Sequence, residues 1–425
     1  MEAAVYPDWS ALPEELTALV LRVLDILDLF RAGAACTSWY AAYSAARRVR
    51  IPIKDASPCL LYSCADDDAD TATLYSPSGG AAFKVRLPAP AFRSHHVVGS
   101  GHGWVITADE KSNLQLLNPL TTAQLDLPPV TGLHHVDSFA DEQGRTMYRL
   151  YGEDPWRPDY AMPYKPKELR LFLYHRAYLS CRPPAGAACV VLLLCQPDGE
   201  LSFARLGDDR WTHIAKSQFV QRGSGYRGAA YNDKDGLFYL VSFDSSVHTL
   251  DLNGPTPVVK CIVKQYSQDD DPIRSVILAP WGDMLQVWRY AELRCSEDLK
   301  VSEQIANEVI GPGQESFTCD LELYKVDINY QKLVKISGLE LQEYALFLGF
   351  SSPMSLPTKD FPTFKPNSVY ITEDSSENIY INKYGCGEVG IWNFETGNLE
   401  SFGTIQSAHP RLNWPPPVWI TPYLS

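Results

Sequence analysis

The sequence lacks the paired cysteines on which structural metal sites depend. Its ten cysteines are scattered along 425 residues, and no two of them stand in a C-x-x-C arrangement. Without such pairs we predict no structural zinc site, and we expect no other metal and no cofactor. Several cysteines, including Cys189 and Cys195, lie inside apolar runs, which is typical of buried thiols in a reducing compartment.

Signals for secretion and for membrane insertion are also missing. No N-x-S or N-x-T glycosylation acceptor occurs, and the first residues contain no basic stretch followed by an apolar one. The longest apolar run, residues 187–195, is too short to cross a bilayer. We therefore expect a protein that has no membrane partner and that works in the cytoplasm and/or the nucleus.

Positive charge is in short supply. The chain has 37 Lys and Arg against 51 Asp and Glu, a net charge of −14. Such a surface repels phosphate backbones, so nucleic acid is not an expected partner. Proline, glycine and aromatic residues are plentiful by contrast, a mixture that favours many short strands joined by turns.

The first fifty residues have the apolar period of a small helical module. Pro13 suits the first turn of a helix, Asp28 is placed to cap a second one that begins at Leu29, and a third is expected over 38–48. The apolar positions that follow one face of the first helix are Leu12, Leu16, Leu19, Val20, Val23, Leu24 and Leu27. Three short helices enclose a very small core, so we predict a docking module whose apolar face awaits another protein. A cap packed on the rest of the chain is the alternative.

This segment resembles the F-box motif, LPxELxxxILxxLxxxDLxRxxxVCxxW. The matching residues are Leu12, Pro13, Glu15, Leu16, Val20, Leu24, Asp28, Leu29, Arg31, Cys36 and Trp39. Ala35 stands where the motif usually has valine. The resemblance implies that residues 8–50 bind an SKP-type adaptor and, through it, cullin and RING subunits. Carried over by position, the adaptor-binding residues are Leu12, Pro13, Leu16, Val20, Leu24 and Leu29.

Residues 56–425 change to the pattern of one all-β domain. Short apolar stretches alternate with polar or glycine-containing turns, as in 114–122, 247–255 and 390–398. The shorter spacings between such turns match the 40–50 residue unit of propeller blades. The fold class we predict is an α + all-β multidomain chain: a three-helix F-box followed by a single β-propeller of about six blades. An insertion at 291–308 is expected to contribute a short helix.

The same region resembles the plant F-box-associated KIB-type β-propeller family. The matching stretches are Gly103–Trp104, Leu117–Thr121, Leu127–Pro129, Gly207–Trp211, Gly236–Leu240, Leu346–Gly349, Asn367–Ile371 and Pro416–Trp419. Their order along the chain is specific although each is short. The resemblance implies a plant source and a role in recruiting a substrate, without identifying that substrate.

No pattern in the chain identifies a catalytic residue. The G-x-G-x-x-G at 223–228 precedes a strand-like segment where a dinucleotide site needs a helix, so an inter-blade loop is favoured. The histidines at 95–102 and 134–135 include adjacent pairs that point to opposite faces of a strand, which does not make a one-sided ligand set. The acidic runs 66–70 and 269–271 lack the glycine and glutamate of a calcium loop.

One proline-rich segment, 153–167, is our hypothesis for the substrate-binding loop. Prolines stiffen an extended backbone, and aromatic residues and arginine are enriched at interface hot spots. The substrate-binding residues predicted there are Trp156, Arg157, Tyr160 and Tyr164. The alternative is a loop packed along the side of the propeller, its aromatic side chains filling a satellite cluster.

Three functions remain open at this point. We favour a non-catalytic substrate-recognition subunit of an SCF-type E3 ubiquitin ligase, which recruits a protein substrate through the propeller. The second is an adaptor-binding interaction protein that does not promote ubiquitination. The third is a propeller enzyme with a regulatory F-box, for which the 51 acidic residues neither exclude nor single out a catalytic carboxylate pair.

Overall fold

The chain divides into two compact units. The computed structural model describes residues 8–24, 26–48, 57–64, 67–152, 161–197, 199–215, 225–264, 272–295, 314–375, 388–401 and 414–422. One unit combines Met1–Pro58 with Thr421–Ser425, and the other is Cys59–Ile420. No helix among the described residues is long and apolar enough to span a membrane.

The described residues of the first unit form three α-helices. They are α1 (Glu14–Val23), α2 (Ile26–Ala35) and α3 (Thr37–Arg48), preceded by the 3-10 helix η1 (Trp9–Ala11). Pro13 takes the N-cap position of α1. α2 begins earlier than expected, so the predicted capping role of Asp28 is wrong. Asp28 instead lies in the first turn and pairs with Arg31, one turn later, with 3.1 Å between Oδ1 and Nη1.

A small core holds these helices together. Leu21 from α1, Leu29 from α2, and Ala42 and Tyr43 from α3 are buried against one another. Gly33 lets α2 approach α3 closely, because a Cβ at that position would lie 2.8 Å from the Tyr43 ring. The residues that α1 buries, Thr17 and Leu21, lie outside the apolar period read from the sequence, so that period predicted the helix and not the face that packs in this core.

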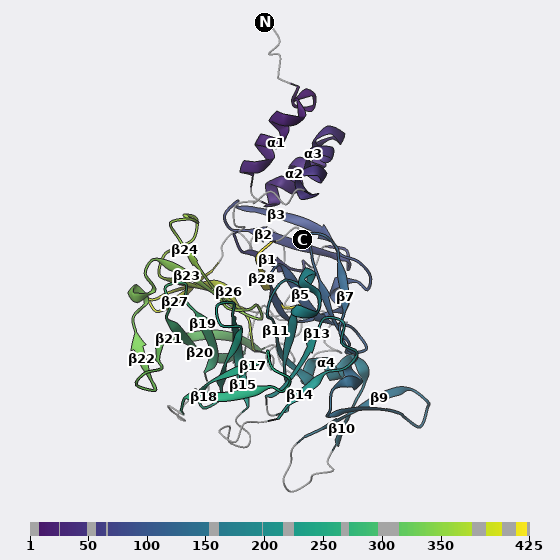
Figure 1. Cartoon of the computed structure of the whole chain (residues 1–425), viewed down its shortest axis with the longest axis vertical. Coiled ribbons are helices and arrows are strands. Elements are labelled where there is room, and N and C mark those ends of the chain that lie inside the picture. The colour runs from purple at the N-terminus through teal and green to yellow at the C-terminus, as the bar shows by residue number, and fades with distance from the viewer. Residues whose placement is uncertain are drawn as a thin grey trace, which may run out of the picture. The chain divides into compact units, whose positions relative to one another are not determined.

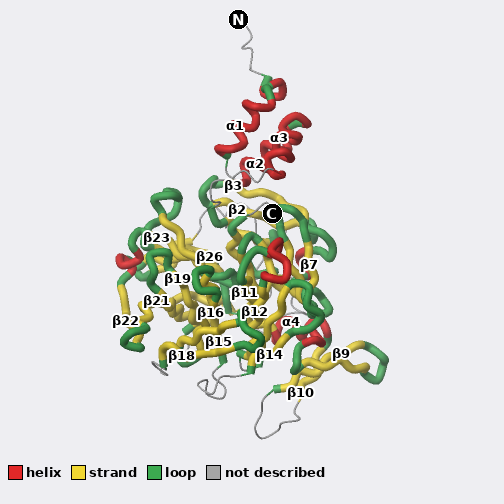
Figure 2. Tube along the Cα trace, viewed as in Figure 1, coloured by secondary structure: helices red, strands yellow, loops and turns green. Residues whose placement is uncertain are grey.

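Strands dominate the second unit, where α4 (Pro166–Leu173) is the one α-helix among the described residues (Figure 2). Consecutive strands lie side by side in short sheets (Figure 1). The first three sheets are β28 (Val418–Ile420) with β1 (Cys59–Tyr62), β2 (Thr71–Ser76) and β3 (Ala81–Arg86); β4 (His96–Gly101), β5 (Trp104–Ala108), β6 (Leu114–Leu117) and β7 (Gln124–Asp126); and β11 (Tyr174–Leu179), β12 (Val190–Cys195), β13 (Glu200–Arg205) and β14 (Thr212–Ile214).

Three further sheets follow along the chain. They are β15 (Tyr226–Asn232), β16 (Leu237–Ser242), β17 (Val247–Asp251) and β18 (Val258–Val263); β19 (Ile273–Leu278), β20 (Met284–Cys295), β21 (Gln314–Asp327) and β22 (Lys332–Ile336); and β23 (Tyr344–Leu348), β24 (Met354–Pro357), β25 (Ser368–Thr372), β26 (Val389–Asn393) and β27 (Asn398–Ser401). A smaller sheet inserted between the second and third contains β8 (Val136–Ala140), β9 (Thr146–Tyr151) and β10 (Ala161–Tyr164). Short 3-10 helices connect some of these strands: η2 (Phe92–Ser94), η3 (Val130–Gly132), η4 (Pro183–Ala188) and η5 (Gly338–Leu341).

Two sheets depart from a simple antiparallel meander. In the first, β28 from the C-terminal part of the unit pairs with β1, the first strand of the unit, and matches Leu60 with Trp419. In the sixth, β23 runs parallel to β25, and β24 occupies the edge. The first sheet thus joins the two ends of the unit by backbone hydrogen bonds.

Neighbouring sheets pack through one edge strand each. β4 contacts both β28 and β11, β11 contacts β15, β15 contacts β19, and β19 contacts β24. One apolar cluster, which includes Leu60, Phe347, Tyr370 and Trp419, joins the sixth sheet to the first. Strands such as β5 and β12 are consequently buried along their whole length on both faces, as is typical of strands in stacked sheets.

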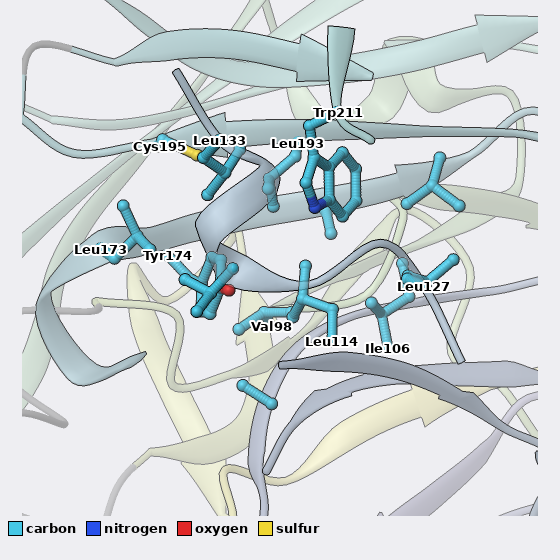
Figure 3. Packing of buried hydrophobic residues seen from close by; sticks show 14 of the residues in the cluster. Val98, Ile106, Leu114, Leu127, Leu133, Leu173, Tyr174, Leu193, Cys195 and Trp211 are labelled. Atoms are coloured by element: carbon cyan, nitrogen blue, oxygen red, sulfur yellow. The ribbon is translucent and has the colours of Figure 1, made fainter. Parts of the chain in front are cut away.

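The largest described core lies between the second and third sheets (Figure 3). Leu169 and Leu173 attach α4 to it, and neither is exposed to solvent. The hydroxyl of Tyr174 donates to the carbonyl of Ser112, with 2.5 Å between the oxygens. α4 therefore covers one side of this core.

Three local predictions need correction. Helix α4 was not predicted. Within the insertion expected to be helical, residues 291–295 belong to strand β20, and the remainder, 296–308, lies outside the described residues. The segment interpreted as an inter-blade loop is strand β15 from Tyr226 onward, and Gly228 lies inside it, close to the carbonyl of Arg274.

Candidate functional site

The helical unit displays an apolar face that its own core does not use. On α1, Leu16 is 48% exposed and Val23 is 77% exposed, and Leu19 is exposed between them. Positions 16, 19 and 23 lie on one side of a helix, while Thr17 and Leu21 turn inward and are buried. Exposed apolar residues in such a row are typical of a protein-binding surface.

The six residues predicted to bind an adaptor occupy different environments. Leu16 and Pro13 are exposed, while Leu12, Val20 and Leu24 are half-buried. Leu29 is buried within the three helices, where it contributes to their core. Leu19 and Val23 belong to the apolar period read from the sequence, but the positional match to the motif did not select them.

Polar contacts hold the start of this unit in place. The indole Nε1 of Trp39 donates to the carbonyl of Trp9, with 2.8 Å between nitrogen and oxygen. The Ser38 hydroxyl donates to the carbonyl of Ser10 at 3.0 Å. A contact at 3.1 Å with that same hydroxyl lowers the pKa of the Cys36 thiol below its usual value. These bonds tie η1 to α3, so the segment before α1 is positioned by the third helix.

A buried charge network links three sheets of the second unit. Arg289 of β20 contacts the carboxylates of Glu373, Asp374 and Glu388, and Arg176 of β11 lies 3.6 Å from Asp374. All five side chains are at least nine-tenths buried. We call these five residues the buried charge network. They come from the third, fifth and sixth sheets, because Glu373 and Asp374 follow β25 and Glu388 precedes β26.

Electrostatics and hydrogen bonds fix this network. Burial opposes the charge on Arg289, but the surrounding carboxylates outweigh that effect and raise the pKa of its guanidinium. Burial raises the pKa of Glu388 against the opposing influence of Arg289 and Thr318. Glu388 also accepts a hydrogen bond from the Thr318 backbone N–H, with 2.7 Å between nitrogen and oxygen. Arg289 therefore joins the fifth sheet to the sixth through buried charge contacts.

The predicted substrate-binding loop is only partly placed. Trp156, Arg157 and Tyr160 lie outside the described residues. Tyr164 ends β10, where its ring stacks on Phe172 of α4 with 5.5 Å between the ring centroids. The ring is half-buried against the core of the second and third sheets, so it anchors one end of the segment. A role of these four residues in binding a substrate stays a prediction.

The model of the KIB1-4 β-propeller family matches residues 74–393, about three quarters of the 425-residue chain. The chain belongs to the KIB1-4 β-propeller family. The second unit is accordingly a β-propeller, and the expected resemblance to plant F-box proteins with a KIB-type propeller is confirmed.

Relatives of this KIB1-4 family protein are similar along its whole length. F-box protein SKIP23 of Arabidopsis thaliana is 24% identical and the alignment covers 97% of this chain and 96% of the relative. F-box protein At5g25290 of the same plant is 22% identical, with 94% of each chain covered. A shorter match, 32% identical over 28% of this chain and 32% of the relative, is to the F-box/kelch-repeat protein At1g57790 of that plant.

Proposed function

We propose that this protein is the substrate-recognition subunit of an SCF-type E3 ubiquitin ligase. In this proposal residues 8–50 form an F-box that binds an SKP-type adaptor, which connects to cullin and RING subunits, and the β-propeller holds a protein substrate. The exposed apolar face at Leu16, Leu19 and Val23 is the observation that carries the proposal. Its support is the similarity, over nearly the whole chain, to relatives named as F-box proteins.

The proposed role requires no bond-making residue in this chain. A substrate held on the propeller has its lysines at a high effective concentration near the charged conjugating enzyme of the complex. The engagement of Glu373, Asp374 and Glu388 by Arg289 or by hydrogen-bond donors is consistent with this role. We place the complex in the cytoplasm and/or nucleus, because buried free thiols such as that of Cys195 are typical of a reducing compartment.

The proposal includes a propeller of six blades. The six larger sheets supply one blade each, and the sheet β8–β10 is an insertion between the second and third blades. The support is the sequence of contacts from β28 through β4, β11, β15 and β19 to β24, together with the apolar cluster shared by the sixth and first sheets. The pairing of β28 with β1 would then close the ring.

Co-purification from plant cells tests the adaptor interaction. We expect the full-length protein to capture SKP-type adaptor and cullin, and the variants Leu16→Asp and Val23→Asp to lose both. An unpaired charge in the centre of an apolar interface costs several kcal/mol. Leu339→Asp is the matched control, because Leu339 is equally apolar and exposed but lies in the β-propeller unit. Capture of adaptor by Leu16→Asp at wild-type strength would contradict the F-box assignment.

Substrate turnover separates the proposal from its alternative. Proteins captured by the wild type during proteasome inhibition are identified by mass spectrometry. Their half-lives are then measured with and without this protein. A substrate-recognition subunit shortens the half-life of its substrates only when Leu16 is intact. An adaptor-binding protein that does not promote ubiquitination would capture adaptor and leave every half-life unchanged.

A further inference from the structure

Three side chains outside the proposed docking face form a potential metal-ligand set. They are His134, between η3 and β8; Glu200, the first residue of β13; and His213, in β14. Their ligand atoms all lie within 4.8 Å of one another. His134 Nε2 is 2.9 Å from Glu200 Oε2, and His213 Nδ1 is 3.9 Å from the same oxygen.

The strand ladder places Glu200 and His213 on one face. His213 pairs with Ser202, and Glu200 lies two residues before Ser202 on β13, so its side chain points to the same side. Gly199, with φ of 60°, directs the chain into β13. A Cβ there would lie 2.6 Å from the backbone nitrogen of Tyr226, so this approach requires glycine. The β13–β14 ladder thus places the side chains of Glu200 and His213 on the same face of the sheet.

The base of this ligand set is apolar and closely packed. Leu133, Cys195 and Trp211 belong to the buried core between the second and third sheets (Figure 3). Leu133 precedes His134 in sequence, and Cys195 pairs with Glu200 across the β12–β13 ladder. The Glu200 side chain is only 6% exposed, whereas that of His134 is 37% exposed. A carboxylate therefore lies at the bottom and an imidazole lies at the entrance.

The composition of the ligand set favours a transition metal. The rings of His134 and His213 have centroids 3.7 Å apart, so two positive imidazolium rings would repel each other strongly. A third ring, that of His135, lies 4.5 Å from His134. One dication would instead accept a lone pair from each ligating imidazole and lie against the buried carboxylate. Imidazole nitrogen with carboxylate oxygen is a set that suits Zn²⁺ and related ions.

The two distances at Glu200 also fit. Tetrahedral Zn²⁺ with ligand bonds of about 2.1 Å requires ligand atoms about 3.4 Å apart. The two separations at Glu200 Oε2, 2.9 Å and 3.9 Å, lie on either side of that value, so a movement of about half an ångström satisfies both. We propose that His134, Glu200 and His213 bind a divalent transition metal of the Zn²⁺ class, with a fourth coordination position on the side of the exposed His134. The ion ties the start of β8 to β13 and β14.

Metal titration of the purified full-length protein tests this site. After dialysis against EDTA and then metal-free buffer, Zn²⁺ alone is added and its binding is measured by calorimetry. Elemental analysis gives the stoichiometry. We expect one Zn²⁺ per chain. His134→Gln, Glu200→Gln and His213→Asn should each weaken binding by more than about 100-fold, the upper end of the loss caused by removing an outer-shell partner.

Two controls separate a lost ligand from a lost fold. His102→Asn removes a histidine elsewhere in the same unit, at a left-handed backbone position that asparagine tolerates, and should bind Zn²⁺ like the wild type. Thermal unfolding in EDTA should be the same for His134→Gln and the wild type, while added Zn²⁺ should raise only the wild-type melting temperature. Absence of stoichiometric binding in the wild type, or wild-type affinity in both His134→Gln and His213→Asn, would overturn the proposal.

Discussion

Arg289→Met tests whether the buried charge network holds the propeller sheets together. The change removes the guanidinium that lies against the carboxylates of Glu373, Asp374 and Glu388. Since Arg289 is only 2% exposed, water cannot take its place. Removing one partner of a buried ion pair costs about 3–5 kcal/mol, a large fraction of the roughly 5–15 kcal/mol by which a domain is stable.

An exposed arginine provides the matched control. Arg86 is also paired with two carboxylates, at 3.6 Å from Asp68 and 3.3 Å from Asp70, but its side chain lies largely in solvent. Surface ion pairs of this kind contribute about 0–1 kcal/mol. Arg86→Met should therefore change the free energy of unfolding by less than a third of the Arg289→Met effect.

The loss of stability caused by Arg289→Met should also depend on pH, and the direction of that dependence is a second test. The pKa of Glu388 is already raised by burial in the wild type, so its contribution to stability is present at low pH and is lost as pH rises through the folded-state pKa. Loss of Arg289 removes the positive charge that counteracts this rise. Glu388 then takes up a proton more readily in the folded state. The destabilisation caused by Arg289→Met should therefore be largest at neutral pH and shrink as pH falls.

Urea unfolding followed by tryptophan fluorescence measures these differences. Wild type, Arg289→Met and Arg86→Met are compared from about pH 7.5 to about pH 5, toward the ordinary pKa range of carboxyl groups. The reasoning fails if Arg289→Met costs no more than Arg86→Met. It also fails if the cost of Arg289→Met stays constant or grows as pH falls.

Three further predictions concern other parts of the chain. Leu24 packs on the core of the helical unit, so Leu24→Asp should unfold that unit and lower the helical circular dichroism signal, which Leu16→Asp should leave intact. Trp419 of β28 is fully buried, and Trp419→Ala should cost about 3–5 kcal/mol of unfolding free energy in urea titrations; a cost below about 1 kcal/mol would argue against a closing role for β28. Replacing Trp156 and Tyr160 together by alanine should abolish capture of substrate and preserve capture of adaptor, and unchanged substrate capture would place recognition elsewhere.

The sequence predicted those helices and turns that are specified by residues close together in the chain. The 3.6-residue apolar period predicted the first helix, but Leu16, Leu19 and Val23 of that period are exposed, and the helix buries Thr17 and Leu21 instead. Tight turns before buried strands have an equally local signal, because Gly103 and Gly236 have φ of 82° and 72°, which disfavour other residues. Each of these features depends on residues within one or two turns of chain.

Helix α4 shows a local signal that a stronger one obscured. Pro166 occupies its first turn, and Glu168 reaches back to the backbone N–H of Lys165 at 3.4 Å, which are ordinary marks of a helix start. The density of prolines before it favoured an extended loop over the whole segment. In the sequence alone, a proline in the first turn of a helix cannot be distinguished from a proline in a loop. Only the buried positions of Leu169 and Leu173 separate the two interpretations.

The charged and metal-ligand clusters depend on strand register, which composition does not encode. An argument from strand alternation rejected His134 and His135 as a one-sided pair, and that reasoning considered only neighbours in sequence. The ligand set instead takes one histidine from that pair and combines it with His213 and Glu200. Those two share a face because β13 and β14 pair Ser202 with His213. A shift of one residue in this pairing would point His213 away from Glu200.

The buried charge network depends on strand order in the same way, because Arg289 meets Asp374 only when β20 and β25 lie in neighbouring sheets. Sites of this kind become visible when the order and register of the strands are known, and both proposed experiments therefore test the register as well as the chemistry.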